Sequence, residues 1–268
     1  MLKISECLFY AKTTEGYIIK SLCELLKNVI KQGCFIIDSN GISLKMTDNN
    51  NVILVDILLR AENFTLYNYT RPQPLSIGLN MGIFYNLVRE IKKKDSIILY
   101  IEDGNENELS IGIIPKDGVA ITTGQIKVQN FQSVDIDTPP VDSYVNPKIL
   151  RSNTYGKIIK SLSGTVGGNL ITISSDKYNI KFLGSSNGIC SRNVFISNET
   201  GAPEFDEMNH ITQVFETEYL HRLSKISSLS SQLHCYQADA LPIYIKTQVG
   251  SLGSIGIFLK DTSQYSMN

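Results

Sequence analysis

Lysine and arginine side chains recur in four segments of the chain that share a helical spacing of apolar residues. Segments 18–31, 82–94, 153–166 and 217–229 carry net charges of +2, +3, +2 and +1, and the remainder carries −9 within a total of −1. Ammonium and guanidinium groups on helix faces suit phosphate contacts that are independent of base sequence and weaken with salt. A single charged helix face is usually only solvated, but four such faces favour a phosphate-binding surface.

Each basic segment also has an apolar face that can pack against strands. In residues 18–31 this face comprises Ile18, Ile19, Leu22, Leu25, Leu26, Val29 and Ile30, and in residues 82–94 it comprises Ile83, Phe84, Leu87, Val88 and Ile91. Short runs rich in Ile, Val, Thr and Tyr separate the four segments and are typical of strands. The sequence therefore predicts a strand-rich fold with four helices.

The pentapeptide IIKSL occurs twice, at residues 18–22 and 158–162, each time in the first helix of one half of the chain. The same order of helices and strands restarts after a polar, proline-bearing stretch at residues 127–143, which suits a linker. We therefore expect an α+β fold of two similar domains, each with two helices packed on antiparallel sheets. The expected ranges are residues 1–126, the linker 127–143, and residues 144–268.

We expect a soluble intracellular protein, because the first residues show no signal-peptide pattern and no apolar stretch is long enough to span a membrane. It has 268 residues, 42% of them hydrophobic, and nowhere do about twenty apolar residues run together. The five cysteines are scattered and form no CxxC pair, which favours reduced and mostly buried thiols. They are Cys7, Cys23, Cys34, Cys190 and Cys235.

Signals for an enzyme are few. His210, His221 and His234 have no spacing typical of metal ligands, and no nucleophile-elbow, P-loop or dinucleotide-binding motif is present. Asp135 and Asp137 form a DxD pair, but in a polar linker this pair favours a solvated surface over a metal site. We expect no catalytic residues, no metal and no cofactor.

Two stretches of the first half make a family resemblance specific. They are DSNGISLKMTDNNNVILVDILLRAENF at residues 38–64 and SIGLNMGIFYNLVRE at residues 76–90, followed by DSIILYIE. The chain resembles the proliferating cell nuclear antigen family, the DNA sliding clamps of eukaryotes, archaea and many large DNA viruses. The resemblance is strong over residues 15–102 and weaker beyond, where it depends on element order and on the ADALPIYIK strand.

The resemblance implies a noncatalytic processivity factor in DNA replication and repair. Three identical chains would form a closed ring with helices lining the hole and sheets outside, around double-stranded DNA. The edge near residues 119–125 of one subunit would pair with the edge near residues 189–197 of the next. Partners would be DNA polymerase, a clamp loader and other proteins with a clamp-binding peptide, in the nucleus or in a viral replication compartment. The composition would suit a viral clamp or one from an AT-rich genome.

The family's DNA-facing positions match basic residues of this sequence, namely Lys20, Lys27, Arg89, Lys157, Lys160 and Lys225. Charge and helical phase alone add Lys92 and Arg222. Asn86 and Gly164 stand where the family usually has basic residues, and the glycine predicts that the third helix is short or frayed. Lys177 matches a lysine that eukaryotic clamps present for ubiquitin-type modification, although a lysine in a strand turn needs no such role.

In the family, an aromatic-rich helical turn of a partner docks in an apolar pocket. The matching positions are Met46, Thr47, Ile136, Pro140, Tyr144, Pro242, Phe258 and Leu259. Asp137 replaces a usually apolar linker residue, and Lys260 and Asp261 replace a small residue and a proline. We therefore expect the pocket to be used with a changed peptide preference.

Other functions remain open from the sequence. Within DNA binding, the alternatives are one chain of a heteromeric checkpoint-type clamp and a monomeric processivity factor. From a different class, a β-rich structural protein or a hydrolase whose site the motifs do not reveal is the alternative.

Overall fold

The computed structural model describes residues 4–118, 121–129, 136–144, 146–165, 168–186, 190–197 and 204–265. The chain forms two compact units. The first comprises Met1–Met46, Val55–Ile136 and Gln248–Ile255, and the second comprises Thr47–Leu54, Asp137–Thr247 and Gly256–Asn268. Each unit is described separately below.

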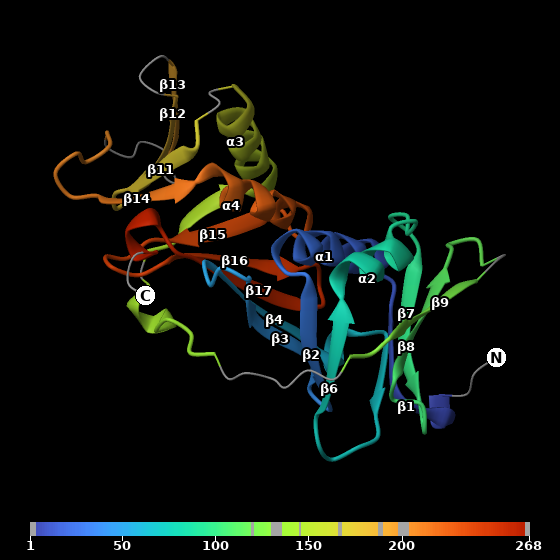
Figure 1. Cartoon of the computed structure of the whole chain (residues 1–268). Coiled ribbons are helices and arrows are strands. Elements are labelled where there is room, and N and C mark those ends of the chain that lie inside the picture. The colour runs from blue at the N-terminus through green and yellow to red at the C-terminus, as the bar shows by residue number, and fades with distance from the viewer. Residues whose placement is uncertain are drawn as a thin grey trace. The chain divides into compact units, whose positions relative to one another are not determined.

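The first unit contains two helices among antiparallel strands (Figure 1). In chain order they are β1 (Cys7–Thr13), α1 (Gly16–Val29), β2 (Gln32–Asp38), β3 (Gly41–Thr47), β4 (Ile53–Arg60), β5 (Leu66–Tyr69), β6 (Leu75–Asn80), α2 (Met81–Val88), β7 (Ser96–Glu102), β8 (Glu108–Ile114) and β9 (Thr122–Lys127). Short 3-10 helices lie at Ile4–Glu6 and Ala61–Asn63.

The strands of the first unit form two groups of hydrogen-bonded neighbours. One is a five-stranded sheet in the order β5-β1-β7-β8-β9, and the other has the order β4-β3-β2-β6. Helices α1 and α2 pack against each other (Figure 1). Apolar residues of α1 at helical spacing, such as Ile19, Leu22 and Leu26, are almost fully buried, which fixes the opposite, lysine-bearing face outward.

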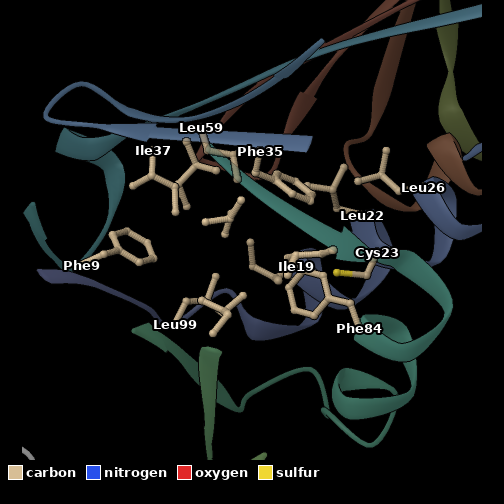
Figure 2. Close-up of a pocket in the computed structure, with 14 residues that line it drawn as sticks. Phe9, Ile19, Leu22, Cys23, Leu26, Phe35, Ile37, Leu59, Phe84 and Leu99 are labelled. Carbon is tan, nitrogen blue, oxygen red and sulfur yellow. The ribbon is translucent and has the colours of Figure 1, made fainter. Parts of the chain in front are cut away.

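The core of the first unit contains an apolar cavity of about 40 Å³ (Figure 2). Its lining comes from α1, α2 and strands of both groups, including Phe9, Leu22, Cys23, Phe84 and Leu99. The side chains point toward one another across the space, and the lining presents no polar surface. This cavity belongs to the packing of the domain and carries none of the residues expected to bind DNA or a partner.

The second unit repeats the plan. Its elements are β10 (Lys148–Arg151), α3 (Ser152–Thr165), β11 (Leu170–Ser175), β12 (Asn179–Ser186), β13 (Cys190–Ser197), β14 (Ile211–Glu216), α4 (Thr217–Arg222), β15 (Gln232–Tyr236), β16 (Ile243–Val249) and β17 (Gly253–Leu259). The 3-10 helices lie at Val141–Ser143, Leu223–Ser228 and Thr262–Gln264. One sheet has the order β13-β12-β11-β14, and the other strands follow the order β10-β15-β16-β17.

The predicted duplication and fold class are confirmed. Each half begins with a strand and a helix, continues through strands to a second helix, and ends with three strands. The two IIKSL copies lie in α1 and α3, and both bury the second isoleucine and the leucine. Ile19 and Leu22 are 3% and 4% exposed, and Ile159 and Leu162 are 0% and 1% exposed. The pentapeptide recurs because it has the same packing role in both helices.

The predicted second helix is too long, since α2 ends at Val88. The buried carboxylate of Asp95 accepts the backbone N–H of Lys92 at 2.8 Å, and the N–H of Ile91 donates to the carbonyl of Val88. These bonds form a turn in place of further helix. The prediction that Ile83 points inward is also wrong, because its side chain is 50% exposed.

The cap of α2 explains the exposure of Ile83. The side chain of Asn80 accepts the N–H of Ile83 at 3.0 Å and fixes the start of the helix at Met81. In that phase Met81, Phe84 and Val88 face the core. Ile83 lies one position off this apolar face.

The other two helices also differ from expectation. The fourth helix is α-helical only over Thr217–Arg222 and continues as the 3-10 helix Leu223–Ser228. The prediction that the third helix is short is wrong, because α3 reaches Thr165 and has 14 residues, as α1 has. A glycine near the end of a helix is tolerated where the buried face, here Tyr155, Ile159 and Leu162, holds the helix.

The cysteine prediction is confirmed where the structure describes the side chains, since Cys7, Cys23, Cys34 and Cys235 are buried. The side chain of Cys190 lies outside the described ones. No helix in the described part of the chain is long and apolar enough to cross a membrane.

Candidate nucleic-acid interface and partner-peptide site

In the first unit, two lysines of α1 are held by groups from or just beyond α2. The Nζ of Lys20 donates to the carbonyl of Ile91 at 3.0 Å. The Nζ of Lys27 lies 3.6 Å from the centroid of the Tyr85 ring, a close cation–π contact. Both lysines are half-buried. Their ammonium groups are therefore restricted in orientation before any ligand binds.

Arg89 and Lys92 lie beyond the last residue of α2. Arg89 is the C-cap, its side chain is 58% exposed, and its Nε lies 3.3 Å from the carboxylate of Glu90. Lys92 is exposed in the turn that follows, so the prediction that helical phase places it on the DNA-facing side is wrong. Of the two residues, only Arg89 lies directly at the end of α2, a helix that is a candidate for facing DNA.

In the second unit, Lys157 and Lys160 are exposed on α3. This helix packs against α4 and the 3-10 helix that carries Lys225 (Figure 1). Arg222 is different, because its side chain is only 22% exposed and its Nη1 lies 3.3 Å from Oδ2 of the buried Asp48. Each unit thus pairs two basic helical segments, and Arg222 is the member already engaged by a carboxylate.

The expected subunit edges both correspond to terminal strands of sheets. In the first unit β9 ends the five-stranded sheet, and in the second unit β13 ends the four-stranded sheet. Ile121, just before β9, is 54% exposed and Phe195 in β13 is 50% exposed. Residues 119, 120 and 189 of the expected edges lie outside the described residues.

An aromatic cluster forms the centre of the candidate peptide site. Tyr144 is buried, and its hydroxyl donates to the carbonyl of Pro242 at 2.7 Å. Its ring centroid lies 5.5 Å from that of Tyr244 and 6.2 Å from that of Phe258. Tyr244 and Phe258 stack with centroids 4.4 Å apart. Burial, with a smaller effect of Tyr244, raises the pKa of Tyr144 to about 12.

The remaining candidate peptide residues are distributed over both units. Phe258 and Leu259 are 3% and 0% exposed, so they form a floor beneath any docking surface. Thr47 and Pro242 are partly exposed and Pro140 is exposed, all in the second unit. Met46 and Ile136 are partly exposed and belong to the first unit. The structure thus brings Tyr144, Pro242 and Phe258 together.

The two unusual residues after Leu259 have definite structural roles. The N–H of Lys260 donates to the carbonyl of Val52 at 3.0 Å. Asp261 caps the short helix Thr262–Gln264 by accepting the N–H of Ser263, while the side chain of Gln264 accepts the N–H of Asp261. Asp261 therefore starts a capped turn shortly after Phe258 in the chain.

A polar pocket of about 370 Å³ lies around Lys177. The buried ammonium of Lys148 donates to the carbonyls of Asn146 and Lys177, and burial lowers its pKa despite the nearby Asp176. Burial alone would raise the pKa of Asp176, but hydrogen bonds from Tyr178, Asn179 and Asp206 lower it overall. The Asp176 carboxylate accepts hydrogen bonds from the turns that surround it, which makes this carboxylate structural.

The sequence pattern does not indicate several residues of these surfaces. Asp48 lies in the polar stretch DNNN, which is typical of a turn, and its buried contact with Arg222 spans 174 positions of sequence. Tyr85 lies on α2 and contacts Lys27 of α1. The sequence pattern of either helix alone does not indicate this contact between the two helices. Among the described residues, no group of three or more His, Cys, Asp or Glu side chains could hold a metal ion.

Comparisons with known proteins match this architecture. The model of the N-terminal domain of proliferating cell nuclear antigen matches residues 8–138, and that of the C-terminal domain matches residues 142–262. The crystal structure of proliferating cellular nuclear antigen from Entamoeba histolytica is similar, with a TM-score of 0.81, 19% identity, and coverage of 96% of this chain and 99% of that chain. Because the two family models together span nearly the whole chain, it belongs to the proliferating cell nuclear antigen family of DNA sliding clamps.

Proposed function

We propose that three copies of this chain form a closed ring around double-stranded DNA and tether DNA polymerase and other replication and repair proteins. The observation that carries the proposal is the pairing of basic helical segments in each of two similar units, in a chain of the sliding-clamp family. The role is noncatalytic. A clamp loader would open and close the ring, in a nucleus or a viral replication compartment.

Ring closure would use the terminal strands. An unpaired strand edge favours association, and a closed ring satisfies every such edge through pairing with the next subunit. Strands β9 and β13 each end a sheet and carry or adjoin an exposed large apolar residue, Ile121 or Phe195. We propose that β9 of one subunit pairs with β13 of the next. The domain ranges 1–126 and 144–268, with the linker 127–143, belong to the same proposal.

DNA would be held by weak and exchanging contacts. Lys20, Lys27 and Arg89 would face phosphates from the first unit, and Lys157, Lys160 and Lys225 from the second. Such contacts are independent of base sequence, so they permit sliding while ring closure prevents escape. Lys92 remains a weaker member of this surface because it lies in a turn.

The test of the DNA surface is retention on closed circular and linear DNA across a salt series. Log affinity falls with log salt, and each phosphate contact contributes roughly 1 to the steepness of this fall. The double substitution Lys157→Glu, Lys160→Glu should therefore make the fall less steep by about 2 or more. Lys246→Glu is the matched control, because Lys246 is also exposed but lies on strand β16. An unchanged slope in the double variant would contradict the proposed surface.

A partner peptide would dock against the aromatic cluster of Tyr144, Tyr244 and Phe258. Buried aromatic rings provide a firm floor for hydrophobic anchors of a short helical turn. Thr47, Pro140 and Pro242 would supply accessible surface from the second unit, and Met46 and Ile136 complete the proposed set. The capped turn that begins at Asp261 replaces the usual end of the pocket, which supports a changed peptide preference.

A further inference from the structure

The loop between β3 and β4 is organised by one buried carboxylate. Asp48 is 3% exposed, and its Oδ1 accepts the N–H groups of Val52 and Ile53, each at 2.9 Å. Its own N–H donates to the carbonyl of Ile53, and the N–H of Asn51 donates to the carbonyl of Asp48. Asn51 has a φ of 55°, in the left-handed region that asparagine tolerates. The loop conformation therefore depends on the carboxylate of Asp48.

Two side chains of α4 hold this loop from one side. Arg222 places Nη1 3.3 Å from Oδ2 of Asp48, and its guanidinium lies 5.3 Å from the Tyr219 ring centroid. The hydroxyl of Tyr219 accepts a hydrogen bond from Nδ2 of Asn50 at 3.0 Å. A carboxylate whose side chain is 1% exposed requires a counter-charge far more than an exposed one does. Removing Arg222 would thus leave a buried carboxylate held, among the described residues, only by the backbone N–H groups of Val52 and Ile53.

The same loop is bonded to the floor of the proposed peptide site. The carbonyl of Val52 accepts the N–H of Lys260, which directly follows Phe258 and Leu259. At its other end, the loop continues directly from Thr47. A short chain of hydrogen bonds and one ion pair therefore connects Arg222 through Asp48 and Val52 to the strand end that carries Phe258.

We propose that Arg222 is a positioning residue for the partner-peptide site and not a DNA contact, an inference that rests on the proposed function of that site. By neutralising Asp48 it keeps the loop at residues 48–53 in one conformation, so that the peptide meets a preformed surface. Binding to a preformed surface avoids the entropic cost of ordering the loop. A phosphate contact would instead require Arg222 to leave the buried carboxylate.

The test compares Arg222→Gln, Arg222→Lys and Asp48→Asn in the full chain, with Lys225→Gln as the control basic residue. The probe is a synthetic peptide with an aromatic-rich helical turn, titrated by calorimetry, and amide hydrogen exchange reports on Val52 and Ile53. Arg222→Gln should speed exchange of both amides about tenfold and weaken the peptide about 3- to 10-fold, because the loop then opens locally. Arg222→Lys should recover part of both effects, and Lys225→Gln should cause neither.

A double-mutant cycle separates positioning from general destabilisation. In the Asp48→Asn background, Arg222→Gln should change peptide affinity by less than about twofold, because the charge that needs neutralising is gone. The salt slope of DNA binding should stay the same in Arg222→Gln and fall in Lys225→Gln. The inference is overturned if Arg222→Gln lowers the salt slope while leaving peptide affinity and loop exchange unchanged. If the wild-type chain binds no peptide, both this inference and the proposed partner site are wrong. If the wild-type chain binds the peptide and Arg222→Gln does not change the affinity, only this inference is wrong.

Discussion

The ammonium of Lys27 lies 3.6 Å from the centroid of the Tyr85 ring, so a DNA-facing candidate of α1 is held by an aromatic side chain of α2. A ring at this distance attracts the cation while leaving its outward N–H groups able to reach a phosphate. The contact joins the two helices of the first unit at their polar surface.

Tyr85→Leu should therefore destabilise the fold by about 0.5–1 kcal/mol more when Lys27 is present than when it is replaced by methionine. Tyr85→Phe keeps the ring face and should have no such effect. Urea unfolding of the single and double variants measures the coupling. Equal losses in both backgrounds would show that the ring contributes only packing.

Asp176 should make the second unit sensitive to acid. Its native-state pKa is lowered, so the unfolded chain binds this proton more readily than the folded chain does. Its stabilising contribution is complete above the ordinary aspartate pKa of about 4 and is lost as the pH falls through the native-state value. Asp176→Asn should therefore flatten the loss of stability below about pH 4, measured by thermal unfolding in a pH series. Asp239→Asn, an exposed neighbour in the same pocket, is the control, and equal acid sensitivity of wild type and Asp176→Asn would contradict the assignment.

The cavity of the first unit makes its lining sensitive to truncation. Leu26 is 1% exposed and lines the space (Figure 2), so Leu26→Ala enlarges an existing void and should cost about 3–5 kcal/mol. Leu58→Ala removes the same atoms from a side chain that is 38% exposed and should cost less than about 1 kcal/mol. Chemical denaturation compares the two, and similar losses would mean that the lining collapses onto the enlarged space.

The peptide preference should have shifted away from the family's usual motif. A standard clamp-binding peptide should bind weakly, and the peptide from this protein's own polymerase should bind better, because Lys260 and Asp261 start a capped turn at the end of the site. Phe258→Ala should abolish measurable binding of the second peptide, since it removes a stacked ring of the floor. Tyr144→Phe, which keeps the ring and loses the bond to Pro242, should retain most of the binding. Calorimetric titration decides, and tight binding of the standard peptide would refute the shift.

The sequence predicted what depends on local periodicity. The buried face of α1 and the repeated role of IIKSL follow from the 3.6-residue spacing of apolar residues. This spacing places Ile19 and Ile159 on the apolar faces of their helices, and both are buried. The phase of α2 did not follow from the pattern, because Asn80 sets its start and the buried Asp95 forms a turn after it. The partner of Arg222 could not be found either, since Asp48 is 174 residues away in the chain and lies in a stretch typical of exposed turns.

The molar mass of the chain in solution tests the proposed ring most directly. Light scattering coupled to size exclusion at micromolar concentration should give about three times 29.9 kDa for the wild type. Phe195→Asp at the β13 edge should shift this mass toward one chain, while Leu66→Asp should not, because Leu66 is similarly exposed but lies on β5, at the opposite end of the five-stranded sheet from β9. A wild-type mass near 29.9 kDa, with no larger species after crosslinking, would contradict the account.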